Sequence, residues 1–266
     1  MYELNREAVD KARPLFAELP HPQQVLIEAV WAGNHVGRLF VDDRDAPASA
    51  LLYAACDFIV LAGEAHNGAF NQAWHKALVQ EILPSGWCFF MDPGERWNPV
   101  LDRLFAGSTI HRATRSAFTL YDERVRARMH TEWRQRIPEG YEVRRYDRDL
   151  AAGAPDLAQF WGSIDNFLAN GVGVAVVHGD EVVSRCHTVF VGKGEAEISI
   201  ETQESHRRRG LAALTANAFI EQCAERGLKP AWSCWSDNKP SVALAEHLGF
   251  VRGPDVPMVI VEPLGG

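Results

Sequence analysis

The sequence has few cysteines, and their arrangement is not typical of a metal or disulfide site. There are five, an odd number, and they are dispersed without a C-x-x-C pair. Such a set favours reduced thiols, and therefore a cytoplasmic location, over a disulfide framework or a zinc cluster. We accordingly expect no bound metal.

Long apolar runs and an excess of positive charge are also missing. No stretch approaches the roughly 18 to 20 uninterrupted apolar residues of a membrane span. Residues 1–16 are mixed in charge and lack the apolar centre of a signal peptide. The formal net charge of −8 disfavours polyanionic partners and mildly favours a small cationic substrate. We therefore expect a protein that engages neither membranes nor nucleic acid.

The chain itself has the composition of a globular protein, with 266 residues of which 47% are hydrophobic and 23% charged. Apolar periodicity and turn residues predict helices at 22–32, 67–83, 95–105, 150–168 (interrupted), 211–226 and 237–248. The same patterns predict strands at 37–41, 50–61 (one or two strands), 87–91, 109–121, 141–146, 171–177, 181–190, 198–200, 229–235 and 256–261.

These elements form two units of similar order, so we predict an α+β protein in which each unit is a mixed, mostly antiparallel sheet flanked by helices. The predicted domains are 1–125 and 141–266, joined by a connector at 126–140. Residues 122–136 carry many arginines. They are interpreted as a solvated helix or connector, with a helix that binds nucleic acid or an acidic ligand as the alternative.

The stretch with the most specific chemistry is 195–212, EAEISIETQESHRRRGLA. An alternating strand leads through a short polar link into three arginines, a glycine and the start of an amphipathic helix. The free N–H groups of a first helical turn and the positive end of the helix dipole both favour an anion. Without a bound anion, three positive charges at the N-terminus of a helix are unfavourable. The stretch therefore predicts a phosphate site.

Two spaced motifs resemble those of the GNAT acyltransferase superfamily. Arg207, Gly210 and Ala212 match its R/Q-x-x-G-x-G/A signature between a strand and a helix. About 30 residues later, Asn238 and Ser241 precede the ending Leu248-Gly249-Phe250. The resemblance covers residues 141–262. The whole chain resembles a narrower group, the zwittermicin-resistance-type acetyltransferases, whose N-terminal half is a degenerate GNAT-like domain. The matching features are Gly37-Arg38, Val41-Asp42-Asp43, Asp57-Phe58, Leu61-Ala62-Gly63-Glu64 and Trp232-Ser233-Cys234.

The resemblance implies acetyl-CoA as the acyl donor, with its pyrophosphate on the backbone of residues 208–212. It implies that the Ile200 N–H faces the thioester carbonyl and that Thr202 contacts the pantetheine. The implied cofactor-binding residues are Ile200, Thr202, Arg207, Arg208, Arg209, Gly210, Leu211, Ala212, Asn238 and Ser241. The first unit lacks the signature, so we expect it to supply walls of the substrate cleft or rigidity instead of binding CoA.

A base that accepts the proton of an amine nucleophile is expected on the same strand. Glu197 and Glu201 are the candidates, and their even spacing places both side chains on one face. The alternative is that one or both are ordinary solvent-facing carboxylates. His206 could touch a phosphate or serve only a structural role.

The proton donor to the leaving thiolate is not evident. Many members of the superfamily use a Tyr at the position that is Ala245 here. Cys234, Ser236, His247 and water are the remaining candidates. Cys234 is either a covalent acyl acceptor or, as we expect, a buried strand residue.

The function expected from this sequence is direct transfer of an acetyl group from acetyl-CoA to the amine of a small molecule. Resistance to an amine-bearing antibiotic is a narrower form of that hypothesis. The alternative from another class is an acyl-CoA-binding sensor or assembly module with weak or no catalysis, which the missing tyrosine keeps open. The acceptor is not identified, and a homodimer is an open alternative to a monomer.

Overall fold

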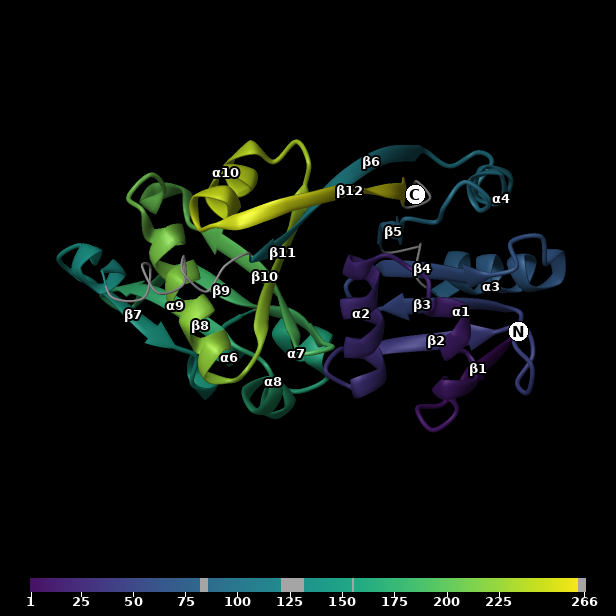
Figure 1. Ribbon diagram of the computed structural model, residues 1–266, viewed down its shortest axis with the longest axis horizontal. Coiled ribbons are helices and arrows are strands. Elements are labelled where there is room, and N and C mark those ends of the chain that lie inside the picture. Colours follow the sequence, from purple (N-terminus) through teal and green to yellow (C-terminus); the bar gives the residue numbers. More distant parts are fainter. Residues whose placement is uncertain (82–85, 121–131, 155, 263–266) are drawn as a thin grey trace.

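The computed structural model describes residues 1–81, 86–120, 132–154 and 156–262 (Figure 1). Most of the predicted arginine-rich helix at 122–136 lies outside these ranges. Its described end, Trp133–Arg136 (η2), is a 3₁₀ turn. Two lobes, each built of strands covered by helices, lie side by side along the longest axis of the molecule.

The strands of both lobes belong to one mixed sheet, which has 12 strands in the described part of the chain. Its spatial order is β1-β2-β3-β4-β5-β12-β6-β11-β10-β9-β8-β7. The strand bounds are Tyr2–Leu4 (β1), Gly37–Val41 (β2), Ser49–Ala54 (β3), Phe58–Gly63 (β4), Cys88–Met91 (β5), Ile110–Leu120 (β6), Tyr141–Arg145 (β7), Gly173–His178 (β8), Glu181–Gly192 (β9), Glu195–Thr202 (β10), Lys229–Trp235 (β11) and Phe250–Val261 (β12).

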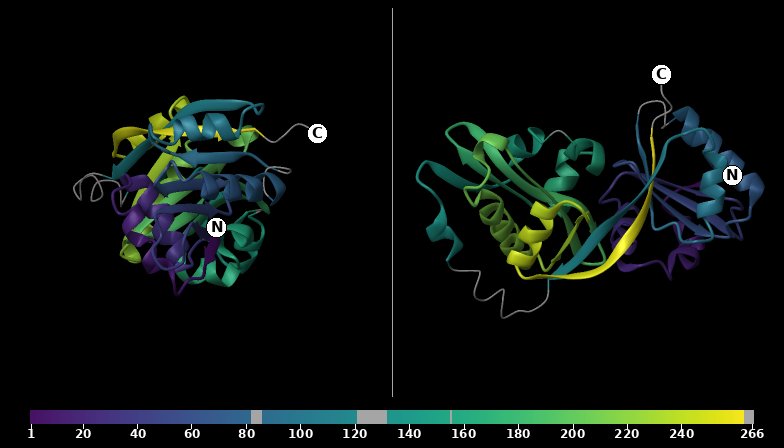
Figure 2. Two further views of the ribbon diagram at one scale, coloured as in Figure 1. Left: turned by 90° about the vertical axis from the view of Figure 1, so that its right-hand side faces the viewer. Right: turned by 90° about the horizontal axis from the view of Figure 1, so that it is seen from above.

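The two lobes exchange their last strands. β6, the last strand of the first half, pairs with β11 of the second half. β12, the last strand of the second half, pairs with β5 of the first. The two exchanged strands also pair with each other and form the long ribbon that joins the lobes (Figure 2). The predicted boundary at 125 to 141 stays a prediction, but any cut there separates β6 from its neighbours in the second lobe.

The order of strands on either side of this ribbon is the same. Each lobe has one parallel pair, β4·β5 in the first and β10·β11 in the second, next to antiparallel strands. Each parallel crossover contains a helix, α3 (Gly68–Glu81) in the first lobe and α9 (Leu211–Glu225) in the second. The predicted pair of similar α+β units is therefore confirmed.

The remaining helices cover the two faces of the sheet. Their bounds are Val9–Lys11 (η1), Arg13–Phe16 (α1), His21–Ala32 (α2), Asn98–Leu104 (α4), Arg148–Ala152 (α6), Leu157–Trp161 (α7), Ile164–Asn170 (α8), Glu204–His206 (η3) and Lys239–His247 (α10). Side chains that accept first-turn N–H groups begin several of them, namely Asp147 for α6, Ser163 for α8 and Asn238 for α10.

Each lobe has an apolar core of its own. In the first lobe, Phe70, Trp74 and Leu78 of α3 are buried against one face of the sheet. In the second lobe, Trp161, Phe167 and Phe219 are fully or almost fully buried. Burying one such large side chain contributes roughly 1.5 to 3 kcal/mol relative to leaving it exposed.

Helix α2 of the first lobe packs directly on β9 of the second. At Gly192 the backbones approach so closely that a Cβ would collide with the carbonyl oxygen of Val25 and the amide of Ala29. Asn34 adds a hydrogen bond of 3.0 Å from its side-chain amide to the carbonyl oxygen of Val191. This packing fixes the lobes around the space between α2, β9 and β10.

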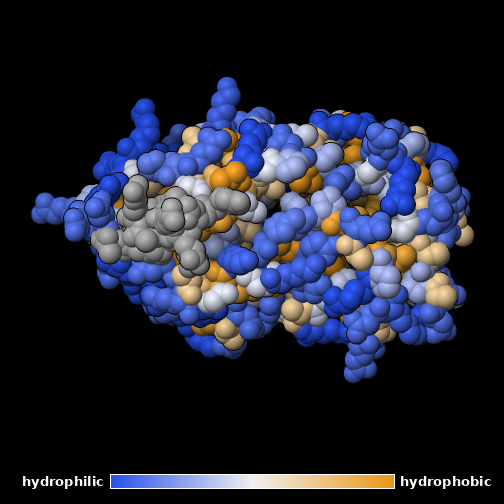
Figure 3. All heavy atoms as spheres, in the orientation of Figure 1, coloured by the Kyte–Doolittle hydropathy of each residue, from blue (hydrophilic) through white to orange (hydrophobic). Residues whose placement is uncertain are grey.

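Hydrophilic residues dominate the face of the molecule shown in Figure 3, and apolar ones form small separate areas. In the described residues, no helix is both long and apolar enough to cross a membrane.

Candidate active site

Strands β10 and β11 diverge in the middle of the sheet. Their parallel register covers only Glu195 to Glu197 of β10 and Lys229 to Ala231 of β11. Beyond this point β10 continues on β9 and β11 continues on β6. The register of β10 with β9 shifts at the same place, between Glu197 and Ile198. The result is an opening between two neighbouring strands that is lined by backbone.

One pocket extends from this opening to the start of α9. It is a groove of about 660 Å³. Most of the predicted cofactor-binding residues line it, namely Ile200, Thr202, Arg207, Arg208, Gly210, Leu211, Ala212, Asn238 and Ser241. Arg209 is not among them and instead donates a 3.1 Å hydrogen bond to the hydroxyl of Tyr141.

Gly210 precedes the first turn of α9 with a φ of +79°, in the left-handed region that favours glycine. A Cβ on Gly210 would meet no described atom within 4 Å. The residue is therefore required by its backbone conformation, and the space above it is free for a ligand. Arg208 also has a positive φ, of 61°, so the loop ahead of α9 is held in an unusual conformation.

The side chains that frame this groove also hold the surrounding structure. Arg207 Nε donates to the Thr202 carbonyl oxygen at 3.0 Å, which ties the arginine loop to the end of β10. The Thr202 hydroxyl shares a 2.9 Å hydrogen bond with Ser184 Oγ. His206 lies at the edge of the groove, with Nδ1 3.0 Å from the Tyr141 hydroxyl.

Asn238 and Ser241 lie where α10 begins. The Asn238 side chain accepts the N–H of Ser241 at 3.3 Å, so it caps the helix. The Ser241 hydroxyl accepts the indole N–H of Trp232 at 3.1 Å. Both residues line the groove and also the second pocket described next, as does Ile200.

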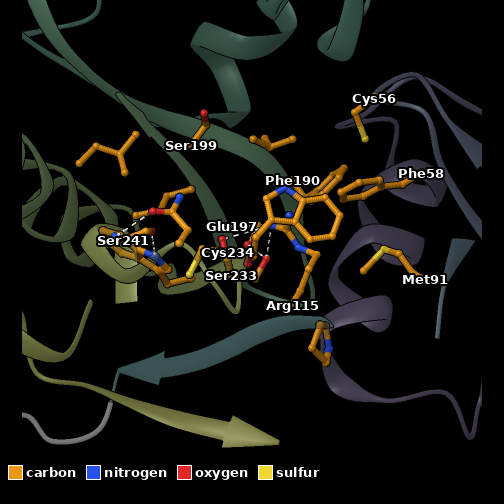
Figure 4. A pocket seen from close by; sticks show the side chains of 17 residues that line it. Cys56, Phe58, Met91, Arg115, Phe190, Glu197, Ser199, Ser233, Cys234 and Ser241 are labelled. Atoms are coloured by element: carbon orange, nitrogen blue, oxygen red, sulfur yellow. Dashed lines mark hydrogen bonds between the residues drawn. The ribbon is translucent and has the colours of Figure 1, made fainter. Parts of the chain in front are cut away.

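The second pocket is a cavity of about 270 Å³ on the other side of the opening. Residues of both lobes line it (Figure 4). The first lobe contributes Pro22, Cys56, Phe58, Met91 and Arg115, and the second contributes Val189, Phe190, Glu197, Ile198, Ser199, Ile200, Trp232, Ser233, Cys234, Trp235, Asn238 and Ser241. Its walls are mostly apolar and aromatic, with a few polar groups among them.

Glu197 and Arg115 are the charged groups of this cavity, and Ser233 connects them. Arg115 Nη2 donates to Ser233 Oγ at 2.8 Å, and Ser233 Oγ donates to Glu197 Oε1 at 2.6 Å. Burial raises the pKa of Glu197, while the Ser233 hydrogen bond and the Arg115 charge oppose that rise. A carboxyl group with a raised pKa in a cleft is suited to proton transfer near neutral pH.

Glu201, the other predicted base, lies elsewhere. It is exposed to solvent and lines the groove, whereas Glu197 lines the cavity. The two carboxylates therefore face different pockets, even though both lie on β10.

The candidates for a proton donor are spread out. Ala245 is completely buried in the core of the second lobe. Ser236 bonds to Ser116, with 3.0 Å between the hydroxyl oxygens, and His247 is exposed on α10. Cys234 is buried at the cavity wall, and its burial raises the pKa of the thiol. The described residues contain no group of three or more His, Cys, Asp or Glu that could hold a metal ion.

Sequence reasoning did not identify Arg115 or Ser233 as site residues. Ser233 belongs to the quoted Trp232-Ser233-Cys234 match, which was a usable signal. Arg115 is one of two arginines in a predicted strand of the other unit, and nothing local distinguishes it. Its place in the cavity follows from the exchange of β6, which is a long-range feature.

In the corresponding crossover of the first lobe, between β4 and α3, hydrogen-bonded side chains precede the helix. Asn67 donates to Asp42 Oδ2 at 2.8 Å and to Ser49 Oγ at 3.2 Å. Asp42 Oδ1 also accepts backbone N–H groups of residues 43, 48 and 49. A carboxylate thus lies beside the helix start that corresponds to the arginine loop of the second lobe.

Comparison with known proteins gives a match over most of the chain. A family model described as GNAT acetyltransferase matches residues 13–255. The uncharacterized N-acetyltransferase YdfB of Bacillus subtilis strain 168 is 29% identical over 219 residues, which make up 80% of this chain and 81% of that protein.

Two solved structures have a similar fold over their whole length. A GCN5-related N-acetyltransferase-like protein from Streptococcus suis 89/1591 gives a TM-score of 0.75 at 23% identity, covering 96% of this chain and 99% of that one. A tandem GNAT protein from the clavulanic acid biosynthesis pathway gives a TM-score of 0.61 at 16% identity, covering 99% and 98%. At these identities the likeness concerns the fold.

Proposed function

The chain belongs to the GNAT acetyltransferase family and is an acyltransferase, and we propose that it moves an acetyl group from acetyl-CoA directly to the amine of a small molecule. The observation that carries the proposal is the meeting of two pockets at the opening between β10 and β11. Ile200, Asn238 and Ser241 line both pockets. A donor in the groove and an acceptor in the cavity would therefore touch at one point.

The groove has the features that a nucleotide thioester requires. One end of it is the N-terminus of α9, a helix of 15 residues, where free N–H groups favour phosphate. Gly210 leaves the space in front of these groups free, and Arg207 and Arg208 supply positive charge beside it. The unpaired edge of β10 gives an extended arm the chance to add as a further strand. Acetyl-CoA, when bound, supplies an activated acetyl thioester.

Glu197 is the base in this proposal. It is at the cavity wall, and its raised pKa allows it to accept a proton from an amine near neutral pH. Ser233 holds one carboxylate oxygen and so fixes the orientation of the group. The Ile200 N–H is proposed to stabilise negative charge on the thioester oxygen, a contribution on the order of 3 kcal/mol.

Direct transfer is favoured over a covalent acyl-enzyme. Cys234 and Cys56 are the cysteines at the cavity, and burial raises the pKa of both thiols. For Cys56 the pKa is about 12. Neither group is therefore a thiolate near neutral pH, the form that attacks an acyl group.

The size and walls of the cavity support a small acceptor. A volume of about 270 Å³ lies at the lower end of ligand pockets, which are typically a few hundred Å³ or more. Phe58, Phe190, Met91 and Trp235 offer apolar contact. The first lobe thus has a proposed role as one wall of the acceptor site.

Calorimetric titration with acetyl-CoA and CoA, followed by thiol release with a panel of amines, tests the proposal. We expect binding of both nucleotides and release of CoA that depends on the amine. Binding without release for any amine supports the second candidate, an acyl-CoA sensor, which the buried Ala245 at the usual tyrosine position favours. No binding of either nucleotide contradicts both.

A further inference from the structure

We infer that the acceptor carries a carboxylate as well as an amine, and that Arg115 binds the carboxylate. This inference rests on the proposed function, because it concerns the acceptor of that reaction. It starts from the position of Arg115, which reaches the cavity from β6, the strand that the first lobe contributes to the sheet of the second.

The guanidinium of Arg115 is held in place and keeps free donors. Nη2 is occupied by the carbonyl and hydroxyl oxygens of Ser233, at 3.2 and 2.8 Å. Nε is buried and has no hydrogen-bond partner among the described residues, and Nη1, which is not among the buried atoms, makes no hydrogen bond to them either. The rings of Trp235 and Phe58 lie 5.0 and 5.5 Å from its central carbon and restrict its movement. A planar cation fixed with spare donors is suited to a carboxylate.

In the protein without a ligand, the unused hydrogen-bond donors of the Arg115 guanidinium cost free energy. A buried donor without a partner costs about 1 to 3 kcal/mol. Such a group needs an explanation, and a charged ligand that supplies the missing partner is one. Figure 4 shows Arg115 pointing from β6 towards Glu197 and Ser233, at the middle of the cavity.

The charge balance during the reaction points to the same ligand. Arg115 and Glu197 are the only Asp, Glu, Lys or Arg among the described residues that line the cavity. While Glu197 is ionised, the two charges cancel. An amine that enters as an ammonium ion gives its proton to Glu197 before it attacks. The carboxyl group and the amine are then both neutral, and the arginine cation is the remaining charge between aromatic walls, which is unfavourable. A carboxylate on the acceptor restores neutrality at that stage, and an acceptor without a carboxylate does not.

The competing interpretation is that Arg115 acts only through Ser233 to position Glu197. In that case its removal slows the reaction equally for every amine. The ratio of kcat/KM between two acceptors that share an amine and differ only in a carboxylate separates the two, because a common effect on Glu197 cancels in the ratio.

The experiment measures this ratio with 4-(aminomethyl)benzoate and 4-(aminomethyl)benzamide, and with a series of aminocarboxylates of graded length and their carboxamides. For the unsubstituted protein we expect the best carboxylate to be preferred over its amide by about 10-fold to 100-fold, the range of a hydrogen bond to a charged group. In Arg115→Gln the ratio should fall to near one, and Arg115→Lys should keep part of it. Acetyl-CoA titration of each variant reports whether the cofactor groove is intact.

Each outcome is decisive. If the unsubstituted protein acetylates the carboxamides as fast as the carboxylates, the inference is overturned and the proposed function stands. The inference is also overturned if Arg115→Gln lowers both rates but leaves the carboxylate-to-amide ratio of kcat/KM unchanged. That result supports the positioning role. If neither series is acetylated while another amine of the panel is, the inference is overturned and the proposed function stands. If no amine of the panel releases CoA, the proposed function itself is contradicted. The first of these tests uses only the unsubstituted protein, so it does not depend on whether a variant folds.

Discussion

Arg115 and Glu197 come from opposite halves of the chain and share the hydroxyl of one serine. Arg115 donates to Ser233 Oγ at 2.8 Å, and the same oxygen donates to Glu197 at 2.6 Å. The connection exists because β6 of the first lobe pairs with β11 of the second, where Ser233 lies. The exchanged strand thus makes the first lobe part of the candidate active site.

Replacing Glu197 by Gln should lower kcat by about 10²-fold to 10⁴-fold, the usual contribution of a positioned base. The matched control is Glu201→Gln on the same strand, which we expect to have a small effect because Glu201 lies in the groove. Acetyl-CoA affinity should be unchanged in Glu197→Gln. A loss of the same size in both variants contradicts the assignment of Glu197.

The pH dependence of kcat at saturating amine tests the same residue. The ionised carboxylate is the active form of a base, so activity rises with pH as Glu197 loses its proton. Since burial raises the pKa of Glu197, this rise should lie above the pH range of an ordinary glutamate. In Glu197→Gln the rise should disappear. A rise that survives the substitution belongs to another group.

Gly210→Ala should weaken acetyl-CoA binding, whereas the control variant Gly227→Ala should leave it unchanged. Both glycines have a positive φ, +79° and +68°, and at both a Cβ would meet no described atom within 4 Å. Each substitution should therefore lower the free energy of unfolding by about 1 to 2 kcal/mol. Only Gly210 lines the groove, so only its Cβ enters the space of the proposed pyrophosphate.

Calorimetry and thermal unfolding measure the two effects on the same samples. Equal acetyl-CoA affinity in the two variants would remove the arginine loop from the proposed donor site. Unequal stability would show that one of the backbones relaxes.

The exchanged strands predict that the lobes do not fold independently. Residues 141–266 expressed alone lack β6, the neighbour of both β11 and β12. We expect this fragment to show no cooperative unfolding transition and no acetyl-CoA binding, and expect residues 1–125 added in trans to restore both. Cooperative unfolding and full affinity of the fragment alone would contradict this prediction.

Local patterns in the sequence predict much of the fold. The strands predicted at 37–41 and 229–235 have the observed bounds, and the helix predicted at 22–32 is observed as His21–Ala32. Short-range signals explain this success, since turn residues and apolar periodicity act within one element. The strand Tyr2–Leu4 was missed because three residues are too short for a pattern, and β12 begins at Phe250, six residues earlier than predicted.

One part of the candidate site is likewise visible in local sequence, and the other part is not. Gly210, Ala212 and the arginines ahead of them are close together in the chain, so the sequence alone predicts a groove-lining loop here, and the phosphate site stays a prediction. The cavity proposed for the acceptor could not be predicted from local patterns, because Phe58, Met91 and Arg115 enter it through the packing of one lobe on the other. The different surroundings of Glu197 and Glu201 likewise depend on where β10 separates from β11.

A single-turnover reaction tests the central claim most directly. The protein at a concentration equal to acetyl-CoA is mixed with a reactive amine from the panel, and mass spectrometry follows the amine, the CoA and the intact protein. The account predicts one acetylated amine for each free CoA, with the protein mass unchanged throughout. Acetyl-CoA that binds but never acetylates any amine, or an acetyl group that accumulates on the protein before it appears on the amine, would contradict it.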